Sequence, residues 1–342
     1  MKPLSHFKSK SKSRILIFEF ITGGGFSQQA LPSSLAKEGL LMLEALLAEL
    51  GGLGNIELTL VLDWRIEHLE LPENTSLVIV SKNECIYEVL PELIENVDWV
   101  WPVAPEVDAI LQKVTALVES KSKQLLNSSS EAVALCSDKF LCSQILEQHA
   151  IATVETILLE QFSQTIHKQW VLKPRDGVGC LKCYLISNTQ TFTQVANQVD
   201  IKSDYIMQPY IEGDSLSLSC LFKDGKAWLL CCNQQVVSIH NGMFQLDACI
   251  VNIPLQQASL YQTLIDGIAT AIPGLFGYVG IDIIQPEQGP PRVLEINPRL
   301  TTSYTGINQA TGLNVASAVI AMTEADPVVI KSCEQQVTVT II

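Results

Sequence analysis

Two kinds of hydrophobic pattern alternate through the first 120 residues of the chain. Short runs of β-branched and aromatic residues predict strands, and longer stretches with apolar residues at helical spacing predict helices. Strands are expected at residues 14–20, 56–62, 77–80 and 97–103, and helices at 35–50, 86–94 and 107–119. Strands that alternate with helices predict a parallel sheet covered by helices on its faces.

The pattern changes after residue 120. Residues 121–131 are rich in Ser, Lys and Asn and predict a connection. Beyond it we expect helices at 138–149, 259–272 and 314–322, and strands at 153–158, 170–173, 205–210, 216–223, 227–232, 280–285 and 292–296. The predicted organisation is a flexible basic tail (1–13), an α/β domain with a parallel sheet (14–120), and an α+β domain with lobes at 131–204 and 205–330.

Composition and charge narrow the class of protein. The 342 residues are 47% hydrophobic and 17% charged, which is typical of a folded domain with a sizeable core. The net charge is −14, and because the first 14 residues carry five basic side chains and no acidic one, the rest of the chain carries −19. Such an acidic body repels polyanions, so we expect no nucleic-acid partner. We take the basic start as a frayed tail, with a targeting role as the alternative.

Two further features bear on where the protein works. No apolar stretch reaches the roughly 18 residues of a membrane span, so we expect no membrane partner. Six of the ten cysteines lie in or beside apolar runs, and Cys180 and Cys183 form a CxxC with no second one. This usage favours a reduced, cytoplasmic protein over a disulfide-bonded one. The oligomeric state stays open, with a homo-oligomer among the alternatives.

A candidate phosphate-binding segment follows the predicted strand at 170–173. Lys173 ends that strand, and Gly177 and Gly179 lie in the loop after Pro174. Lysine supplies a cation for phosphate oxygens, and glycine lets backbone N–H groups approach them closely. The spacing differs from the P-loop pattern GxxxxGK[ST]. A surface turn after an edge strand is the alternative.

A second segment links two predicted strands with the sequence QPYIEGD, residues 208–214. A crossing between two lobes can offer backbone groups to an adenine edge and an acidic side chain to ribose hydroxyls. A plain hairpin connection is the alternative.

The third segment places oxygen-bearing side chains inside apolar strands. Asp282 lies in the strand at 280–285, and Glu295 and Asn297 lie two residues apart in the next one, so they share a face. Carboxylate and amide oxygens are the ligands that Mg²⁺ takes beside phosphates. Arg299 adds a permanent cation. The alternative is a structural ion pair between an acidic side chain and Arg299.

These three segments, in this order and spacing, resemble the ATP-grasp superfamily of carboxylate–amine ligases, in which two lobes clamp ATP between antiparallel sheets. The resemblance covers residues 137–322 and makes the N-terminal α/β domain the pre-ATP-grasp domain. It implies that Lys139 and Lys173 touch the ATP phosphates and that Gly177 and Gly179 belong to the loop that covers them. It further implies that Gln208, Tyr210 and Ile211 form the adenine hinge, with Glu212 or Asp214 near the ribose.

The same resemblance implies that Asp282, Glu295 and Asn297 hold Mg²⁺ or Mn²⁺, and that Arg299 steadies the transferred phosphate. The implied reaction joins two small molecules, an acid and an amine. ATP phosphorylates the acid, and the amine then displaces phosphate to form an amide.

Four segments resemble the subgroup that contains tyramine–L-glutamate ligase, which serves methanofuran biosynthesis: the strand and loop at 17–25, with the triple glycine, and the segments at 35–39, 99–110 and 233–235. This closer resemblance implies that Glu19, Gly24 and Glu106 face the substrates. A tight turn without ligand contact is the alternative for the triple glycine. Two other functions stay open: a ligase for other amino-acid substrates, and a non-catalytic ATP-binding sensor.

Overall fold

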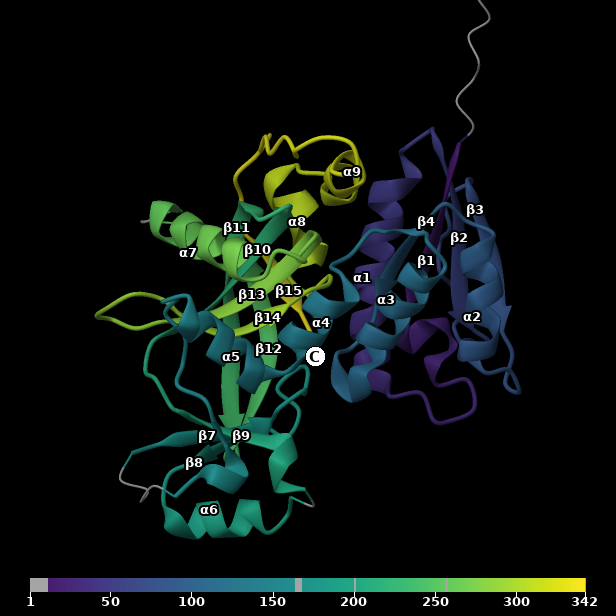
Figure 1. The fold of residues 1–342 in the computed structure, drawn as a ribbon. Coiled ribbons are helices and arrows are strands. Elements are labelled where there is room, and N and C mark those ends of the chain that lie inside the picture. The colour runs from purple at the N-terminus through teal and green to yellow at the C-terminus, as the bar shows by residue number, and fades with distance from the viewer. Residues whose placement is uncertain (1–11, 164–167, 200, 256–257, 342) are drawn as a thin grey trace, which may run out of the picture.

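The computed structural model describes residues 12–163, 168–199, 201–255 and 258–341. The tail predicted at residues 1–13 lies outside these ranges except for its last two residues. Figure 1 shows an N-terminal α/β unit beside a longer β-rich unit, whose lower part in this view carries β7, β8, β9 and α6.

The N-terminal unit contains a parallel sheet of strand order β3-β2-β1-β4-β5, as predicted. Its strands are β1 (Ser13–Glu19), β2 (Ile56–Asp63), β3 (Thr75–Val80), β4 (Trp99–Val103) and β5 (Gln124–Leu125). Its helices are α1 (Ser33–Gly51), α2 (Ile86–Glu95) and α3 (Ile110–Ser120), with short turns of helix η1 (Ile21–Gly25) and η2 (Val107–Ala109).

Helices cover both faces of this sheet because successive side chains of β1 point in opposite directions. Ile15 and Ile17 share one buried cluster with the leucines of α1. Leu16 and Phe18 share another with α2 and α3. The apolar residues of β1 are continuous because this strand is buried on both faces of the sheet.

The second unit contains an antiparallel sheet of strand order β14-β13-β10-β11-β12-β8-β7-β9-β6, with β15 paired to β12. The strands are β6 (Ile157–Leu158), β7 (Trp170–Pro174), β8 (Tyr184–Ile186), β9 (Tyr205–Pro209), β10 (Asp214–Lys223), β11 (Lys226–His240), β12 (Met243–Val251), β13 (Gly277–Gln285), β14 (Arg292–Asn297) and β15 (Val337–Thr340). The helices are α4 (Ser130–Ser137), α5 (Lys139–Gln148), α6 (Thr189–Ala196), α7 (Ala258–Ala271), α8 (Tyr304–Thr311) and α9 (Val315–Ala321), with turns η3 (Leu159–Gln161) and η4 (Lys202–Asp204).

Several elements differ from the prediction. The strand expected at 227–232 is the much longer β11, and β12, β15, α4 and α8 were not expected. The second half of β11 and the first half of β12 are only partly buried, so they lack the continuous apolar run that predicts a strand. Of the strand expected at 153–158, only β6 and an isolated bridge between Thr153 and Val293 form. The connection expected at 121–131 contains β5 and the start of α4.

The two parts of the second sheet are joined by little pairing. Strands β12 and β8 share one residue pair, Met243 with Tyr184. The chain also crosses from β9 to β10 through Gly213, where a Cβ atom would lie 2.4 Å from the Gln285 carbonyl oxygen. Glycine is therefore required at this crossing because the two backbones approach so closely.

All ten cysteines are free thiols. Within the described ranges, no helix is both long and apolar enough to cross a bilayer.

The two units share a hydrophobic core through α1, α8 and α9. Glu49 of α1 is buried in this contact, and its Oε2 atom accepts hydrogen bonds from the Tyr304 hydroxyl at 2.9 Å and the Ala316 N–H at 2.7 Å. Burial disfavours the ionised form and raises the pKa of Glu49 to about 7.

We predict that Glu49→Gln flattens the pH dependence of stability. A carboxyl whose pKa is raised by folding favours the folded state below its unfolded pKa, near 4.5, and this benefit is lost as pH rises through about 7. From about pH 5 to about pH 8, the free energy of unfolding of the variant should therefore rise by about 2 kcal/mol relative to that of the wild type. Urea unfolding at both pH values measures this difference, with Glu44→Gln on the exposed face of α1 as control. Parallel pH profiles for wild type and Glu49→Gln would contradict it.

Candidate active site

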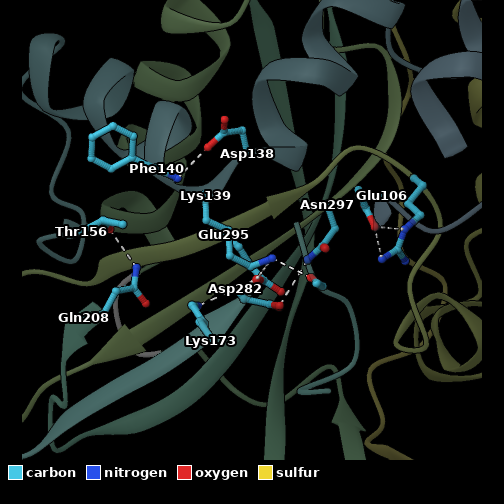
Figure 2. Close-up of polar contacts among 12 residues, drawn as sticks. Glu106, Asp138, Lys139, Phe140, Thr156, Lys173, Gln208, Asp282, Glu295 and Asn297 are labelled. Carbon is cyan, nitrogen blue, oxygen red and sulfur yellow. Dashed lines mark hydrogen bonds and ion pairs between the residues drawn. The ribbon is translucent and has the colours of Figure 1, made fainter. Parts of the chain in front are cut away.

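A cavity of about 470 Å³ lies between the N-terminal unit and the two parts of the second sheet. Most of the residues predicted for the site line it: Glu19, Lys139, Lys173, Gly177, Gly179, Gln208, Tyr210, Ile211, Asp214, Asp282, Glu295, Asn297 and Arg299. Gly24, Glu106 and Glu212 are not part of its lining. Figure 2 shows Lys139, Lys173, Asp282, Glu295 and Asn297 directed toward one another at its centre.

The acidic centre of the cavity is built by two neighbouring strands. Asp282 of β13 lies directly opposite Glu295 of β14, so both carboxylates project on the same face. Asn297, two residues further along β14, donates its side-chain N–H to Asp282 Oδ2 at 3.2 Å. Gln235 of β11 donates to Asp282 Oδ1 at 2.9 Å. The Gln235 contact was not predicted, because only the unexpected length of β11 brings this residue to the site.

Two lysines from different elements reach Glu295: Lys139 begins helix α5, and Lys173 lies in β7. The Nζ atoms of Lys139 and Lys173 lie 3.2 and 4.0 Å from Glu295 Oε2. Burial alone would raise the pKa of Glu295, but the two ammonium groups outweigh it and lower that pKa to about 2. Burial, together with the negative charge of Glu295, raises the pKa of Asp282. At the centre of the cavity, the ionised form of Glu295 is therefore stabilised by two cations, whereas a negative charge on the neighbouring Asp282 is poorly compensated.

This carboxylate pair fits a divalent cation. Asp282, Glu295 and the amide of Asn297 supply hard oxygen donors, and a cation between the carboxylates would relieve their mutual repulsion. In the part of the chain that the structure describes, no three His, Cys, Asp or Glu side chains form a metal cage. Mg²⁺ is commonly held by one or two carboxylates plus substrate phosphates, which is the donor set available here.

Lys139 is positioned by the start of α5. The N-cap Asp138 accepts hydrogen bonds from Phe140 N–H and Leu141 N–H and forms a two-point ion pair with Arg175, at 2.7 and 2.5 Å. Figure 2 shows the contact between Asp138 and Phe140. The Lys139 ammonium also donates to the Gly177 carbonyl at 2.6 Å. The start of α5 is thereby tied to the glycine loop after β7, and this places Lys139 beside Lys173.

The segment between β9 and β10 lines the opposite end of the cavity. Gln208 is buried and donates to the Thr156 hydroxyl at 2.9 Å (Figure 2). The ring of Tyr210 lies 6.3 Å from that of Phe244, and both residues line the cavity with Ile211. Asp214 also lies on the wall, and Glu212 is exposed outside it. Of these two acidic residues, Asp214 alone is part of the cavity lining.

Arg299 joins the cavity to the N-terminal unit. Its Nε and Nη2 atoms donate to one oxygen of Glu106 at 3.0 and 2.8 Å. Burial alone would lower the pKa of Arg299, but Glu106 outweighs it and raises that pKa, so the guanidinium is a permanent cation. Glu106 Oε1 is buried with no hydrogen-bond partner among the described residues. The structure therefore shows Glu106 holding Arg299 rather than lining the cavity.

Glu19 and Gly24 shape the turn after β1. Glu19 lines the cavity, and its carboxylate accepts hydrogen bonds from the Thr22 N–H at 2.6 Å, the Thr22 hydroxyl at 2.5 Å and the Ile21 N–H at 3.2 Å. Burial raises the pKa of Glu19. Gly24 has φ +93°, and a Cβ atom there would lie 2.7 Å from Val80. The triple glycine therefore matches the tight-turn alternative, with Gly24 packed against the sheet.

Sequence reasoning missed the cavity wall formed by α1. Leu35, Glu38 and Met42 line it, and Glu38 accepts a hydrogen bond from the Thr302 hydroxyl at 3.2 Å. A glutamate between leucines on an amphipathic helix resembles a solvated surface residue. Two signals were available: the helical spacing of these three positions, and the resemblance of residues 35–39 to the ligase subgroup, from which no role for Glu38 was predicted.

Comparisons with known proteins agree with this architecture. A family model described as "ATP-grasp domain" matches residues 136–303, and one described as "pre ATP-grasp 3 domain" matches residues 56–133. The chain is 28% identical over 295 residues to tyramine–L-glutamate ligase of Methanocaldococcus jannaschii, which covers 86% of this chain and 84% of that protein.

Two solved structures share the fold. The first is a putative ATP-grasp superfamily protein from Archaeoglobus fulgidus, with TM-score 0.73, 23% identity, and 96% of this chain and 92% of that chain covered. The second is L-amino acid ligase from Bacillus licheniformis, with TM-score 0.70, 15% identity, and 94% and 76% covered.

The two matched domains together span most of residues 56–303. The chain belongs to the ATP-grasp superfamily. Within it, the protein is a ligase of the carbon–nitrogen bond-forming type.

We predict that Gly24→Ala destabilises the fold. Alanine at this positive φ is strained, and its Cβ would collide with Val80, so the combined loss should be about 2–4 kcal/mol. Chemical denaturation measures it, with Gly52→Ala as control because no atom lies within 4 Å of a Cβ there. A fully stable Gly24→Ala variant with impaired activity would instead assign this glycine to substrate contact.

Proposed function

We propose that the protein is an ATP-dependent ligase that joins a carboxylic acid to an amine through an acyl phosphate, with L-glutamate and tyramine as the leading pair. One observation carries the proposal: Lys139 of α5 and Lys173 of β7 converge on Glu295, which lies opposite Asp282, inside one cavity. Such a cluster is suited to neutralising a triphosphate and a cation together.

The nucleotide would lie along the cavity wall. Lys139 and Lys173 would contact its phosphates, under the loop of Gly177 and Gly179, and its adenine would reach the segment that follows Gln208. That segment lies at the β9–β10 crossing. The Tyr210 N–H already donates to the Gln169 carbonyl at 2.9 Å, so the Tyr210 carbonyl and the backbone groups of Ile211 would be the ones to meet the adenine. Asp214 would contact the ribose, and all three residues line the cavity.

A cation would be held by Asp282, Glu295 and Asn297. Mg²⁺ or Mn²⁺ there would offset phosphate charge during transfer. The chain's own residues do the rest: the two lysines orient the triphosphate, and Arg299, fixed by Glu106, presents a cation at the acid's end of the cavity.

The reaction follows from these positions. A carboxylate oxygen of the acid attacks the γ-phosphorus of ATP, the bond to the β-phosphate oxygen breaks, and ADP leaves. The amine nitrogen then attacks the acyl carbon, and the carbon–oxygen bond to phosphate breaks. Phosphorylation makes the reaction feasible because phosphate is a far better leaving group than oxide. The protein contributes position and charge neutralisation, and no covalent enzyme intermediate is needed.

The substrate pair is supported by similarity to tyramine–L-glutamate ligase along most of both chains. This assignment places the protein in the synthesis of a methanofuran-type cofactor. A ligase for two amino acids is the second candidate, which the shared fold with L-amino acid ligase favours. A sensor that binds ATP without turnover is the third, although the intact cluster of charged residues argues against it.

The substrate proposal predicts that ADP release needs both an acid and an amine, and that L-glutamate with tyramine gives the highest rate. A coupled ADP assay across paired acids and amines, with mass analysis of the product, measures this. Faster turnover with two amino acids would select the second candidate. ATP binding with no turnover on any pair would select the sensor.

We predict that Glu295→Gln lowers ligation at least about 100-fold, because the site loses a metal ligand and the charge that holds both lysines. Chelation of divalent cations should abolish the wild-type activity, and added Mg²⁺ should restore it. The exposed Glu44→Gln serves as the matched control for loss of one negative charge. Wild-type turnover by Glu295→Gln would refute the assigned role.

A further inference from the structure

One wall of the cavity is apolar and belongs to the N-terminal unit. Leu35, Glu38 and Met42 are three and four residues apart on α1, so they lie on one face of the helix. The ends of β1 and β4 extend this wall with Ile21, Val103, Ala104 and Pro105. Glu38 is thus a single carboxylate within an otherwise hydrophobic surface of α1.

In its partners, Glu38 differs from Glu19, which also lines the cavity, and from Glu106, which does not. Glu19 receives hydrogen bonds on both oxygens, and Glu106 is paired with Arg299. Among the described residues, Glu38 receives one hydrogen bond, on Oε2 from Thr302, and forms no ion pair. Its other oxygen is available to a ligand in the cavity.

The environment of Glu38 favours a cationic ligand. Burial raises the pKa of Glu38, and the Thr302 hydroxyl and the charge of Arg299 act in the opposite direction. A half-buried carboxylate with one hydrogen bond is costly to ionise, and a cation placed against it removes that cost. Glu38 is held by Thr302, three residues after Arg299, so it lies beside the end of the cavity where the acid would be phosphorylated.

We propose that Glu38 binds the ammonium group of the amine substrate and accepts the proton that this group must lose before it can attack. The substrate is then a primary amine on an apolar body, which Leu35, Met42 and Ile21 would contact. The proposal rests on the proposed function and adds the residue that recognises the amine.

The proton transfer completes the chemistry. The ammonium group gives one proton to the Glu38 carboxylate and becomes a neutral amine. The nitrogen lone pair forms the bond to the acyl carbon, and the carbon–oxygen bond to phosphate breaks with its electron pair leaving on phosphate. The second nitrogen proton departs with phosphate, and Glu38 returns its proton to solvent.

An assay with hydroxylamine in place of the amine separates the proposed role of Glu38, which is to bind and deprotonate the amine, from formation of the acyl phosphate. Hydroxylamine is uncharged at neutral pH, so it needs no proton acceptor before it attacks; it traps the acyl phosphate as a hydroxamate, and its one displaced nitrogen proton departs with phosphate. We expect Glu38→Gln to form hydroxamate from ATP and the acid at the wild-type rate. Amide formation with tyramine should fall about 100-fold or more, through both KM and kcat. Glutamine still accepts from Thr302, so the fold should be preserved.

Two other outcomes would contradict the proposed role of Glu38. Wild-type amide formation by Glu38→Gln would overturn the proposal, and so would equal losses of hydroxamate and amide, which would assign Glu38 to the acid substrate or to structure. Glu44→Gln, on the exposed face of the same helix, controls for the lost charge, and its rates should match wild type. Absence of hydroxamate from the wild-type enzyme with every acid would refute the proposed function itself.

Discussion

The site depends on the ionised Glu295 carboxylate, which is shared by Lys139 and Lys173. The side chains of Lys139 and Lys173 are only 8% and 12% exposed, and an ammonium group with so little exposure is stable only with a close partner. Glu295 provides that partner for both lysines, so the cluster is complete before any nucleotide enters. It also leaves the Asp282 charge without a direct cationic partner at hydrogen-bonding distance among the described residues, and this is the place where a divalent cation fits.

The sequence predicted features that rest on local pattern. The apolar run of β1 predicted a buried strand, and alternation along β14 predicted that Glu295 and Asn297 share a face, next to Asp282. Features that rest on distant pairing could not be predicted. Glu106 and Arg299 are 193 residues apart, and no local pattern marks them as partners. The local pattern around Glu38 is that of an ordinary helix-surface residue, and only the tertiary fold brings Thr302 and the cavity next to it.

The N-terminal unit and the C-terminal part of the second sheet form one continuous body. Tyr304 and Ala316 donate to Glu49, and Arg299 to Glu106, while leucines of α1 pack in the same cluster as α8 and α9. A cavity wall from α1 is therefore fixed relative to the acidic strands β13 and β14. Such rigidity suits a site in which an amine must meet an acyl carbon with defined geometry.

Strands β7, β8 and β9, which carry Lys173 and Gln208, are attached differently. Between β12 and β8 the sheet is continuous through the pair of Met243 and Tyr184 alone, so few backbone hydrogen bonds resist rotation there. A hinge at this junction would move Lys173 away from Glu295, whereas Lys139 lies on α5, which packs against β14 beside Glu295. Opening would therefore break the ion pair of Lys173, and a triphosphate that replaces Glu295 as the counter-charge of Lys173 would favour the closed arrangement.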